Sequence, residues 1–363
     1  MAALLAAAAL SAGAATRASA ATHDVYVANV GDGSVSVVDP TTDAVVATVP
    51  VGSYPVGVAI TPDYSQAWVV NEGNSNVSVI STATNTVTAS VLVGGLPDAI
   101  AFSPDGTRAY VGYVQSPGVS AVAVINTSTR TVIASIPVGD NAFNIAVTPD
   151  GSRVYVANFI GNSVSVIDAA TNTVVNTISG SGMDTPTDIA VSPDGTRAYV
   201  ADFNSGHVFA IDTATSTITA AIPTGPGPEG VYISPDGTRA YVANANANDV
   251  AVIDTATNTV TATIPAGSEP VGVLMSGTIA YVADAASNTV AVIDTATSTV
   301  TATIPVGNTP CAIAQAPVFQ PSGVTAVSRA AASEPILGAR ARMRILSGYA
   351  GPGLASRSLR KTR

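Results

Sequence analysis

The chain has 363 residues, of which 47% are hydrophobic and only 5% aromatic, so its core must be built mainly from Val, Ile and Ala. Residues 21–320 carry 23 acidic side chains and five arginines, a net charge of −18, and such an acidic body argues against nucleic-acid binding because it repels phosphate. Cys311 is the only cysteine, which excludes an intramolecular disulfide.

The first 20 residues have the features of a secretory signal peptide. Residues 4–10 are apolar, and Ala18-Ser19-Ala20 fits a cleavage site made of small residues. The apolar run is too short to span a membrane, so we expect no transmembrane segment here. The mature protein is then expected to be secreted, extracellular or at the cell surface, or periplasmic in a Gram-negative host. An uncleaved anchor is the alternative.

A Tyr-Val-Ala-Asn element and its variants recur seven times, 40 to 45 residues apart. The copies start at Tyr26, Trp68, Tyr110, Tyr155, Tyr199, Tyr241 and Tyr281. This period is typical of a β-propeller, in which each repeat folds into one four-stranded blade. A right-handed β-helix is the alternative, but its coils are shorter.

Residues 226–267 are the clearest repeat unit. Short apolar segments alternate with turn sequences such as Pro235-Asp236-Gly237, which is the pattern of an antiparallel meander. The expected strands are 230–234, 240–244, 249–254 and 259–265. The last of them alternates Thr with apolar residues, as expected for an outer strand that faces water.

The two ends of the repeat region predict how the ring closes. The N-terminal unit begins at residue 24 with a second strand and has no first strand before it, whereas Pro310 to Ala314 matches a first strand that no second strand follows. One C-terminal strand around Cys311 should therefore join three N-terminal strands in one blade. We predict an all-β, seven-bladed β-propeller over residues 21–320, with four antiparallel strands per blade, and a monomer.

The repeats resemble the YVTN family of β-propeller repeats. The match is clearest from Pro228 to Asn244 and from Val250 to Gly267, and it extends over residues 24–316. The resemblance implies a secreted or surface-associated protein of bacteria or archaea, in a family with few defined activities. Two units depart from the pattern: one shortens its first turn to Met275-Ser276-Gly277, and another has an insertion around residues 115–118.

No catalytic motif is evident in the sequence. It has no G-x-S-x-G, H-E-x-x-H or Walker motif, and too few His and Cys residues for a haem, copper or structural zinc site. His23 lies beside the expected cleavage site. His207 lies in a loop between a second and a third strand, where it is either a ligand or base, or a surface residue without a function.

Acidic residues near the starts of the first strands form the candidate site. The residues just before the apolar runs are, in ring order, Val56, Asp98, Asn144, Asp188, Glu229, Val271 and Cys311. Since first strands line the channel of a propeller, Asp98, Asn144, Asp188 and Glu229 could converge at its mouth. Such oxygen ligands suit Ca²⁺, Mg²⁺ or a cationic ligand, and neighbouring carboxylates can shift each other's pKa. The alternative is a wet channel that tolerates acidic residues.

Residues 321–363 form a basic C-terminal tail, with eight of the fourteen basic residues and one acid, Glu334. We expect it to be disordered or a gene-model artefact; binding to an anionic surface is the alternative.

Two functions follow from these observations. The main hypothesis is a non-catalytic scaffold that binds a protein, glycan or small molecule through one loop face and the channel mouth. The alternative is a metal-assisted propeller enzyme, of lactonase or lyase type, that uses the acidic channel site, with Ca²⁺ as the cofactor it could take.

Overall fold

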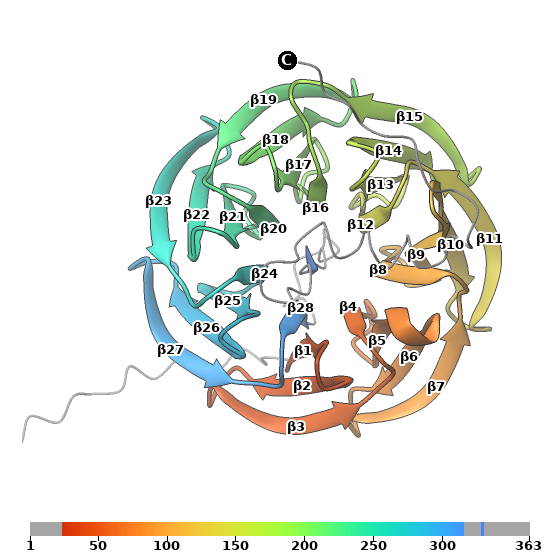
Figure 1. Ribbon diagram of the computed structural model, residues 1–363, viewed down its shortest axis with the longest axis horizontal. Helices are drawn as coiled ribbons and strands as arrows, with labels where there is room; N and C mark the ends of the chain where they lie inside the picture. Colours follow the sequence, from red (N-terminus) through yellow and green to blue (C-terminus); the bar gives the residue numbers. More distant parts are fainter. Residues whose placement is uncertain (1–23, 316–327, 330–363) are drawn as a thin grey trace, which may run out of the picture.

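The computed structural model describes residues 24–315 and the short strand 328–329. The expected signal peptide, His23 and almost all of the basic tail lie outside these residues. The described chain forms seven antiparallel sheets arranged in a ring, which confirms the predicted seven-bladed propeller (Figure 1). None of its helices is long and apolar enough to cross a membrane; the described residues contain one 3₁₀ turn, η1 (Glu72–Asn74).

Each blade is a meander of four strands, numbered along the chain. The first blade contains β1 (Val25–Asn29), β2 (Ser34–Asp39), β3 (Ala44–Pro50) and β28 (Pro310–Gln315). The second blade consists of β4 (Pro55–Ile60), β5 (Gln66–Asn71), β6 (Asn76–Ser81) and β7 (Thr86–Leu92). The third consists of β8 (Leu96–Phe102), β9 (Arg108–Ser116), β10 (Val119–Asn126) and β11 (Thr131–Val138). The fourth consists of β12 (Ala142–Val147), β13 (Arg153–Asn158), β14 (Ser163–Asp168) and β15 (Thr173–Ser179). The fifth blade consists of β16 (Pro186–Val191), β17 (Arg197–Asp202), β18 (His207–Asp212) and β19 (Thr217–Pro223). The sixth consists of β20 (Pro228–Ile233), β21 (Arg239–Asn244), β22 (Asp249–Asp254) and β23 (Thr259–Pro265). The seventh consists of β24 (Pro270–Ser276), β25 (Ile279–Asp284), β26 (Thr289–Asp294) and β27 (Thr299–Pro305).

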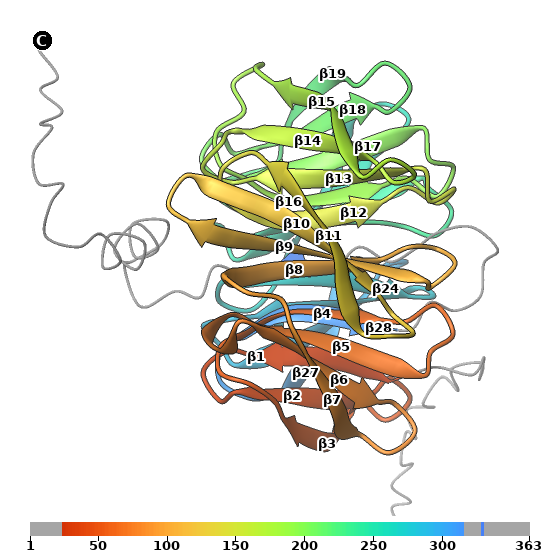
Figure 2. The same ribbon diagram turned by 90° about the vertical axis from the view of Figure 1, so that its right-hand side faces the viewer.

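The strands run between the two faces of the ring (Figure 2). We call one face the turn face; it carries the turns between the first and second strands and between the third and fourth strands. The opposite loop face carries the connections between second and third strands and those that enter each blade. On the turn face, the Thr148 hydroxyl and the Ser152 N–H both donate to the Asp150 carboxylate, at 2.6 and 3.0 Å. Gly151 completes this turn with a φ of +70°.

Burial follows the position of a strand in its blade. The third strand β22 is buried at its four central residues, whereas the fourth strand β23 alternates exposed and partly buried residues before the buried Ile264. This difference confirms the expected outer position of the Thr-rich strands. Strands β20 to β23 lie within two residues of their predicted bounds.

Ring closure follows the predicted arrangement. Strand β28 pairs antiparallel with β1, with Ala312 opposite Ala28 and Ile313 opposite Val27 (Figure 1). The Cys311 thiol is buried 3.3 Å from the Pro55 carbonyl oxygen, so it packs as a small core side chain between the first and second blades. One strand was not predicted: β29 (Ser328–Arg329), which pairs with β28 and extends that sheet to five strands.

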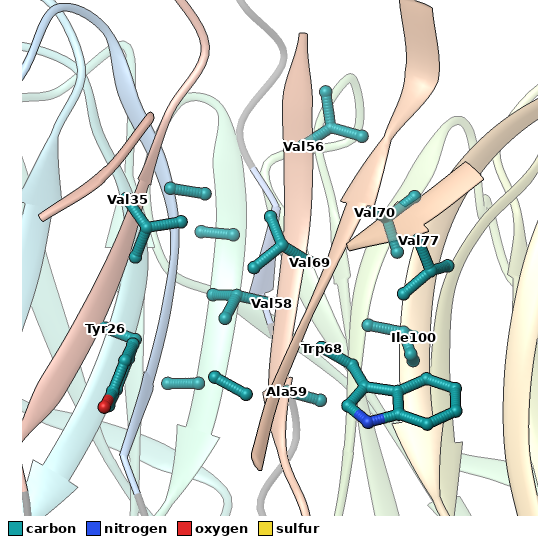
Figure 3. Close-up of a cluster of buried hydrophobic side chains, with 14 of the residues drawn as sticks. Tyr26, Val35, Val56, Val58, Ala59, Trp68, Val69, Val70, Val77 and Ile100 are labelled. Carbon is teal, nitrogen blue, oxygen red and sulfur yellow. The ribbon is translucent and has the colours of Figure 1, made fainter. Parts of the chain in front are cut away.

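The core lies between blades rather than within them. Trp68 of β5 meets Phe102 of β8 edge to face, with ring centroids 5.5 Å apart. Figure 3 shows part of the same cluster, in which Tyr26, Val58 and Ile100 come from the first three blades. Burial of one Val or Ile side chain contributes about 1.5–3 kcal/mol, and most of that burial exists only when a neighbouring blade is present.

Candidate functional site

The four residues predicted at the channel mouth do not occupy equivalent positions. Each first strand has an irregular register near its start, where one or two residues are left unpaired opposite the second strand. The residues at this bulge are Val56, Asp98, Phe143, Thr187, Glu229, Val271 and Cys311. Asp98 and Glu229 belong to this set, whereas Asn144 and Asp188 lie one residue further along their strands.

The side chain of Asp188 joins two blades. Its Oδ2 atom accepts a hydrogen bond from the Val231 N–H of the next blade at 2.7 Å, and its Oδ1 atom accepts from the Ile189 N–H at 2.8 Å. Thr187, beside it, donates to the Pro228 carbonyl of that same blade at 3.1 Å. Asp188 is fully buried, so its carboxylate serves the packing between the fifth and sixth blades.

The other three predicted residues are also buried. Asn144 is fully buried and its Oδ1 atom accepts from the Ile145 N–H at 2.6 Å, while Asp98 and Glu229 are each 2% exposed. Within residues 24–315, no group of three or more His, Cys, Asp or Glu side chains is placed to hold a metal ion. The arc therefore does not fit the expected Ca²⁺ site, and no chemical step is assigned to a metal there.

A second ring of polar residues, not singled out from the sequence, lies at or near the ends of the second strands on the loop face. Its members are Asn29, Asn71, Tyr113, Asn158, Asp202, Asn244 and Asp284. The Asn71 Oδ1 atom accepts from the Gly52 N–H at 3.0 Å, and its Nδ2 atom donates to Asn76 Oδ1 at 2.8 Å. A Cβ atom on Gly52 would lie 2.5 Å from the Asn71 Cγ atom, so this close approach requires glycine. The amide ties the entering loop of a blade to its third strand.

Asp202 replaces this amide in the fifth blade. It is fully buried, and it accepts from the Asp184 N–H at 2.8 Å and from the Ser205 N–H at 3.2 Å. Burial raises its pKa to about 6, with a smaller contribution from the charge of Asp184. The cross-strand partner of Asp202 is His207, at the start of β18. A buried carboxyl group with a raised pKa, opposite a histidine on the paired strand, is a candidate functional site.

His207 is held in one orientation. Its Nδ1 atom lies 2.6 Å from the Ser205 carbonyl oxygen, and its ring packs against Phe209 with centroids 6.2 Å apart. Because a carbonyl oxygen only accepts hydrogen bonds, Nδ1 must carry the hydrogen in this contact and Nε2 has the lone pair in the neutral ring. The side chain is partly exposed on the loop face. It can therefore act as a base toward a bound molecule.

The blade-five site thus consists of Asp184, Asp202, Ser205 and His207. Sequence reasoning named His207 but missed Asp202. A signal was present, because the Tyr-Val-Ala-Asn element ends in Asp at only two of its seven copies, at Asp202 and Asp284.

Solved structures of other proteins share this fold. Hydrazine synthase from Kuenenia stuttgartiensis is 25% identical, with a TM-score of 0.69 over 75% of this chain and 92% of that chain. A protein of unknown function from Desulfotomaculum acetoxidans is 19% identical, with a TM-score of 0.69 over 81% of this chain and 99% of that chain. The dihydro-heme d1 dehydrogenase NirN, in complex with DHE, is 16% identical, with a TM-score of 0.62 over 80% and 75% of the two chains. A search of curated proteins gave no significant match.

A family of propellers with an enzyme name matches the central blades of the sequence. The match covers residues 81–263, half of the chain, and the family is described as lactonase, 7-bladed beta-propeller. The expected non-catalytic scaffold is therefore wrong, because this family is described by an enzyme name and the 25% identical structural neighbour is a synthase by name. The alternative hypothesis of a propeller enzyme fits better, and the chain belongs to the seven-bladed β-propeller lactonase family.

Proposed function

We propose that the protein hydrolyses a lactone at the blade-five site, with His207 as the general base. The observation that carries the proposal is the fixed imidazole of His207 beside the buried Asp202, within the segment that matches the lactonase family. A base of this kind needs an available lone pair and a fixed orientation, and the contact of Nδ1 with Ser205 supplies both.

The reaction needs one water molecule and no other reactant. His207 Nε2 removes a proton from water while the hydroxide oxygen bonds to the lactone carbonyl carbon. The tetrahedral intermediate then collapses, the ring C–O bond breaks, and the imidazolium returns the proton to the departing alkoxide. The product is the open hydroxy acid, so atoms and charge balance.

Asp202 is a positioning residue in this proposal. It accepts from the Ser205 N–H, and the carbonyl of Ser205 holds the imidazole of His207. The same carboxyl accepts from the Asp184 N–H in the loop that enters the blade. One buried group therefore joins the loop that enters the blade to the loop that holds the imidazole.

The test is turnover of a panel of sugar-derived and aliphatic lactones, followed by pH-stat titration of the released acid. His207→Gln keeps a polar side chain but removes the base, and it should lower kcat/KM by roughly 10²–10⁴-fold, the usual contribution of general base catalysis. Thr289→Ala is the matched control, because Thr289 starts the third strand of the seventh blade as His207 does in the fifth.

Thr289→Ala should leave turnover unchanged. Equal activity in His207→Gln and the wild type would rule out His207 as the base. If no lactone in the panel is hydrolysed, the proposed reaction fails as well.

We further propose that the seven units are YVTN-type repeats and that the enzyme is an exported monomer. The Tyr-Val-Ala-Asn elements support the first point, and the Ala18-Ser19-Ala20 sequence supports export. Sedimentation of the protein would test whether it is a monomer. N-terminal sequencing of the mature chain from its host would test whether it is exported with removal of the signal peptide.

A further inference from the structure

Arginines on the turn face bridge neighbouring blades. Arg108 and Arg197 begin the second strands of their blades, and each donates to a backbone carbonyl in the next blade's turn between its third and fourth strands. Arg108 Nη1 lies 2.6 Å from the Ala169 oxygen, and Arg197 makes the equivalent bond to Thr255. Each guanidinium therefore lies across a junction between blades.

Arg153 has the same position in the fourth blade but makes a different contact. Its Nη1 atom lies 2.5 Å from Asp168 Oδ2, in its own blade, and 3.1 Å from the carbonyl oxygen of Ser152. The carbonyl that corresponds to those of Ala169 and Thr255 is that of Thr213, which accepts a hydrogen bond from the Tyr155 hydroxyl at 3.5 Å. Among the residues that the structure describes, no arginine crosses this junction.

The groove at the junction between the fourth and fifth blades is correspondingly larger; Figure 1 labels the strands of these two blades β12–β15 and β16–β19. The groove there has a volume of 890 Å³, compared with 460 Å³ at the preceding junction and 400 Å³ at the following one, which Arg108 and Arg197 bridge. The three grooves are otherwise built from equivalent turns. The turned-away Arg153 contributes to this opening, because it leaves the space of one guanidinium unfilled.

Hydrogen-bond acceptors border the open groove. Asp150 and Asp194 line it from two neighbouring turns, together with Asn176. Hydrogen bonding from the Thr148 hydroxyl lowers the pKa of Asp150, so its carboxylate is charged at neutral pH. Asn176 replaces the Ala found at this point of the fourth strand in the other six blades. Those positions are Ala47, Ala89, Ala134, Ala220, Ala262 and Ala302.

We propose that this groove is a binding site for a guanidinium group, supplied by a small guanidino compound or by an exposed arginine side chain. The guanidinium would occupy the place that Arg108 and Arg197 fill at the adjacent junctions, donating to the Thr213 carbonyl between the carboxylates of Asp150 and Asp194. A planar cation with several N–H donors matches a wall of carbonyl, amide and carboxylate oxygens. The site lies on the face opposite His207 and is independent of the proposed hydrolysis.

Calorimetric titration of the full chain with N-acetyl-L-arginine amide tests the site. We expect one site per chain, and at least fivefold weaker binding of N-acetyl-L-lysine amide, which has the same charge but no planar fork of donors. Asp194→Asn should weaken binding of the arginine probe several-fold. Titration of L-arginine and of the peptide Gly-Arg-Gly in parallel distinguishes the two possible sources of the guanidinium group. Tighter binding of the peptide indicates a protein partner, and equal binding of the two indicates a small compound.

Two variants test the role of the displaced arginine. Asp168 does not line the groove. Asp168→Asn should nevertheless weaken binding of the arginine probe roughly tenfold, because the substitution frees Arg153 to bridge to Thr213 and close the site. Arg108→Ala should create a second site at the preceding junction and raise the stoichiometry toward two. Thermal unfolding of each variant checks that the ring is intact. The proposal fails if the arginine and lysine probes bind equally, if neither binds, or if Asp168→Asn has no effect.

Discussion

At the scale of single residues, two blades carry a carboxyl group where four others carry a buried amide. Asp284 is fully buried at this position, and its Oδ1 atom has no hydrogen-bond partner among the residues that the structure describes. Burial raises its pKa to about 7, and the hydrogen bond from the Gly267 N–H opposes that shift only in part. The carboxyl therefore folds most easily in its protonated form, in which it resembles an amide in shape.

Asp284→Asn should stabilise the protein at high pH and not at low pH. Below about pH 4 the group is protonated in both the folded and the unfolded chain, so it carries no penalty. As the pH rises toward about 7 the unfolded chain loses the proton first, and the free energy of unfolding falls, by an amount on the order of 2–4 kcal/mol once the pH exceeds 7. Urea unfolding of both proteins at pH 4.5 and pH 8 measures the difference.

The converse substitution is the control for this prediction. Asn158 is fully buried at the equivalent position of the fourth blade, and Asn158→Asp should introduce the same loss of stability with rising pH. If Asp284→Asn instead changes the free energy of unfolding equally at both pH values, the effect is one of packing and the group does not titrate as described.

At the scale of elements, strand β28 decides whether the ring is closed. Ile313 of β28 and Ile189 of β16 are equivalent residues of first strands, and both are fully buried. Ile313→Ala should therefore lower the free energy of unfolding as much as Ile189→Ala, by about 2–5 kcal/mol, in a single transition. Denaturant unfolding followed by fluorescence and by circular dichroism measures both values.

The comparison is sensitive because Ile189 lies inside a continuous blade and Ile313 in a strand contributed from the far end of the chain. A small effect of Ile313→Ala beside a large effect of Ile189→Ala would mean that β28 is only loosely joined to β1. The predicted closure would then not be part of the cooperative fold.

The elements were predictable and the site only partly so, for a physical reason. Seven copies of one pattern repeat the same strand lengths and turn residues, and both unpaired ends needed a partner, so closure through the strand around Cys311 followed from the sequence. Strand β29 lies outside the repeats and gave no such signal. Two of the four residues predicted at the channel mouth are out of register with the others, because backbone pairing places the bulge at Phe143 and Thr187, which the polarity of the sequence does not reveal.

His207 was visible as an isolated histidine, but its partner was not sought. Asp202 is detectable only when the copies of the repeat are aligned and the last position of the Tyr-Val-Ala-Asn element, which changes from amide to acid, is followed. What no alignment of the repeats supplies is the direction of the Arg153 side chain. Arg108, Arg153 and Arg197 occupy equivalent positions of the repeat, yet Arg153 contacts a carboxylate and the other two contact carbonyl oxygens.

At the scale of the whole molecule, the charge of the ring should be the largest salt-dependent term in its stability. Residues 21–320 carry 23 acidic side chains against five arginines, and the structure gives many of the carboxylates hydrogen bonds within turns rather than cationic partners. Such bonds keep the groups ionised, as the lowered pKa of Asp105 beside the Ser103 hydroxyl indicates. Folding therefore concentrates negative charge, and mutual repulsion opposes the compact state.

Raising NaCl from about 20 mM to about 500 mM at pH 8 should increase the melting temperature by a few degrees, because the screening length falls from roughly 20 Å to about 4 Å and the repulsion is lost. Differential scanning calorimetry over a salt series measures the shift. Screening saturates once the length is shorter than the spacing of the charges, so most of the increase should occur below about 200 mM. A melting temperature that continues to rise linearly to high salt would instead indicate exclusion of salt from the protein surface. No rise at all would show that the carboxylates are too far apart for their repulsion to limit the stability of the ring.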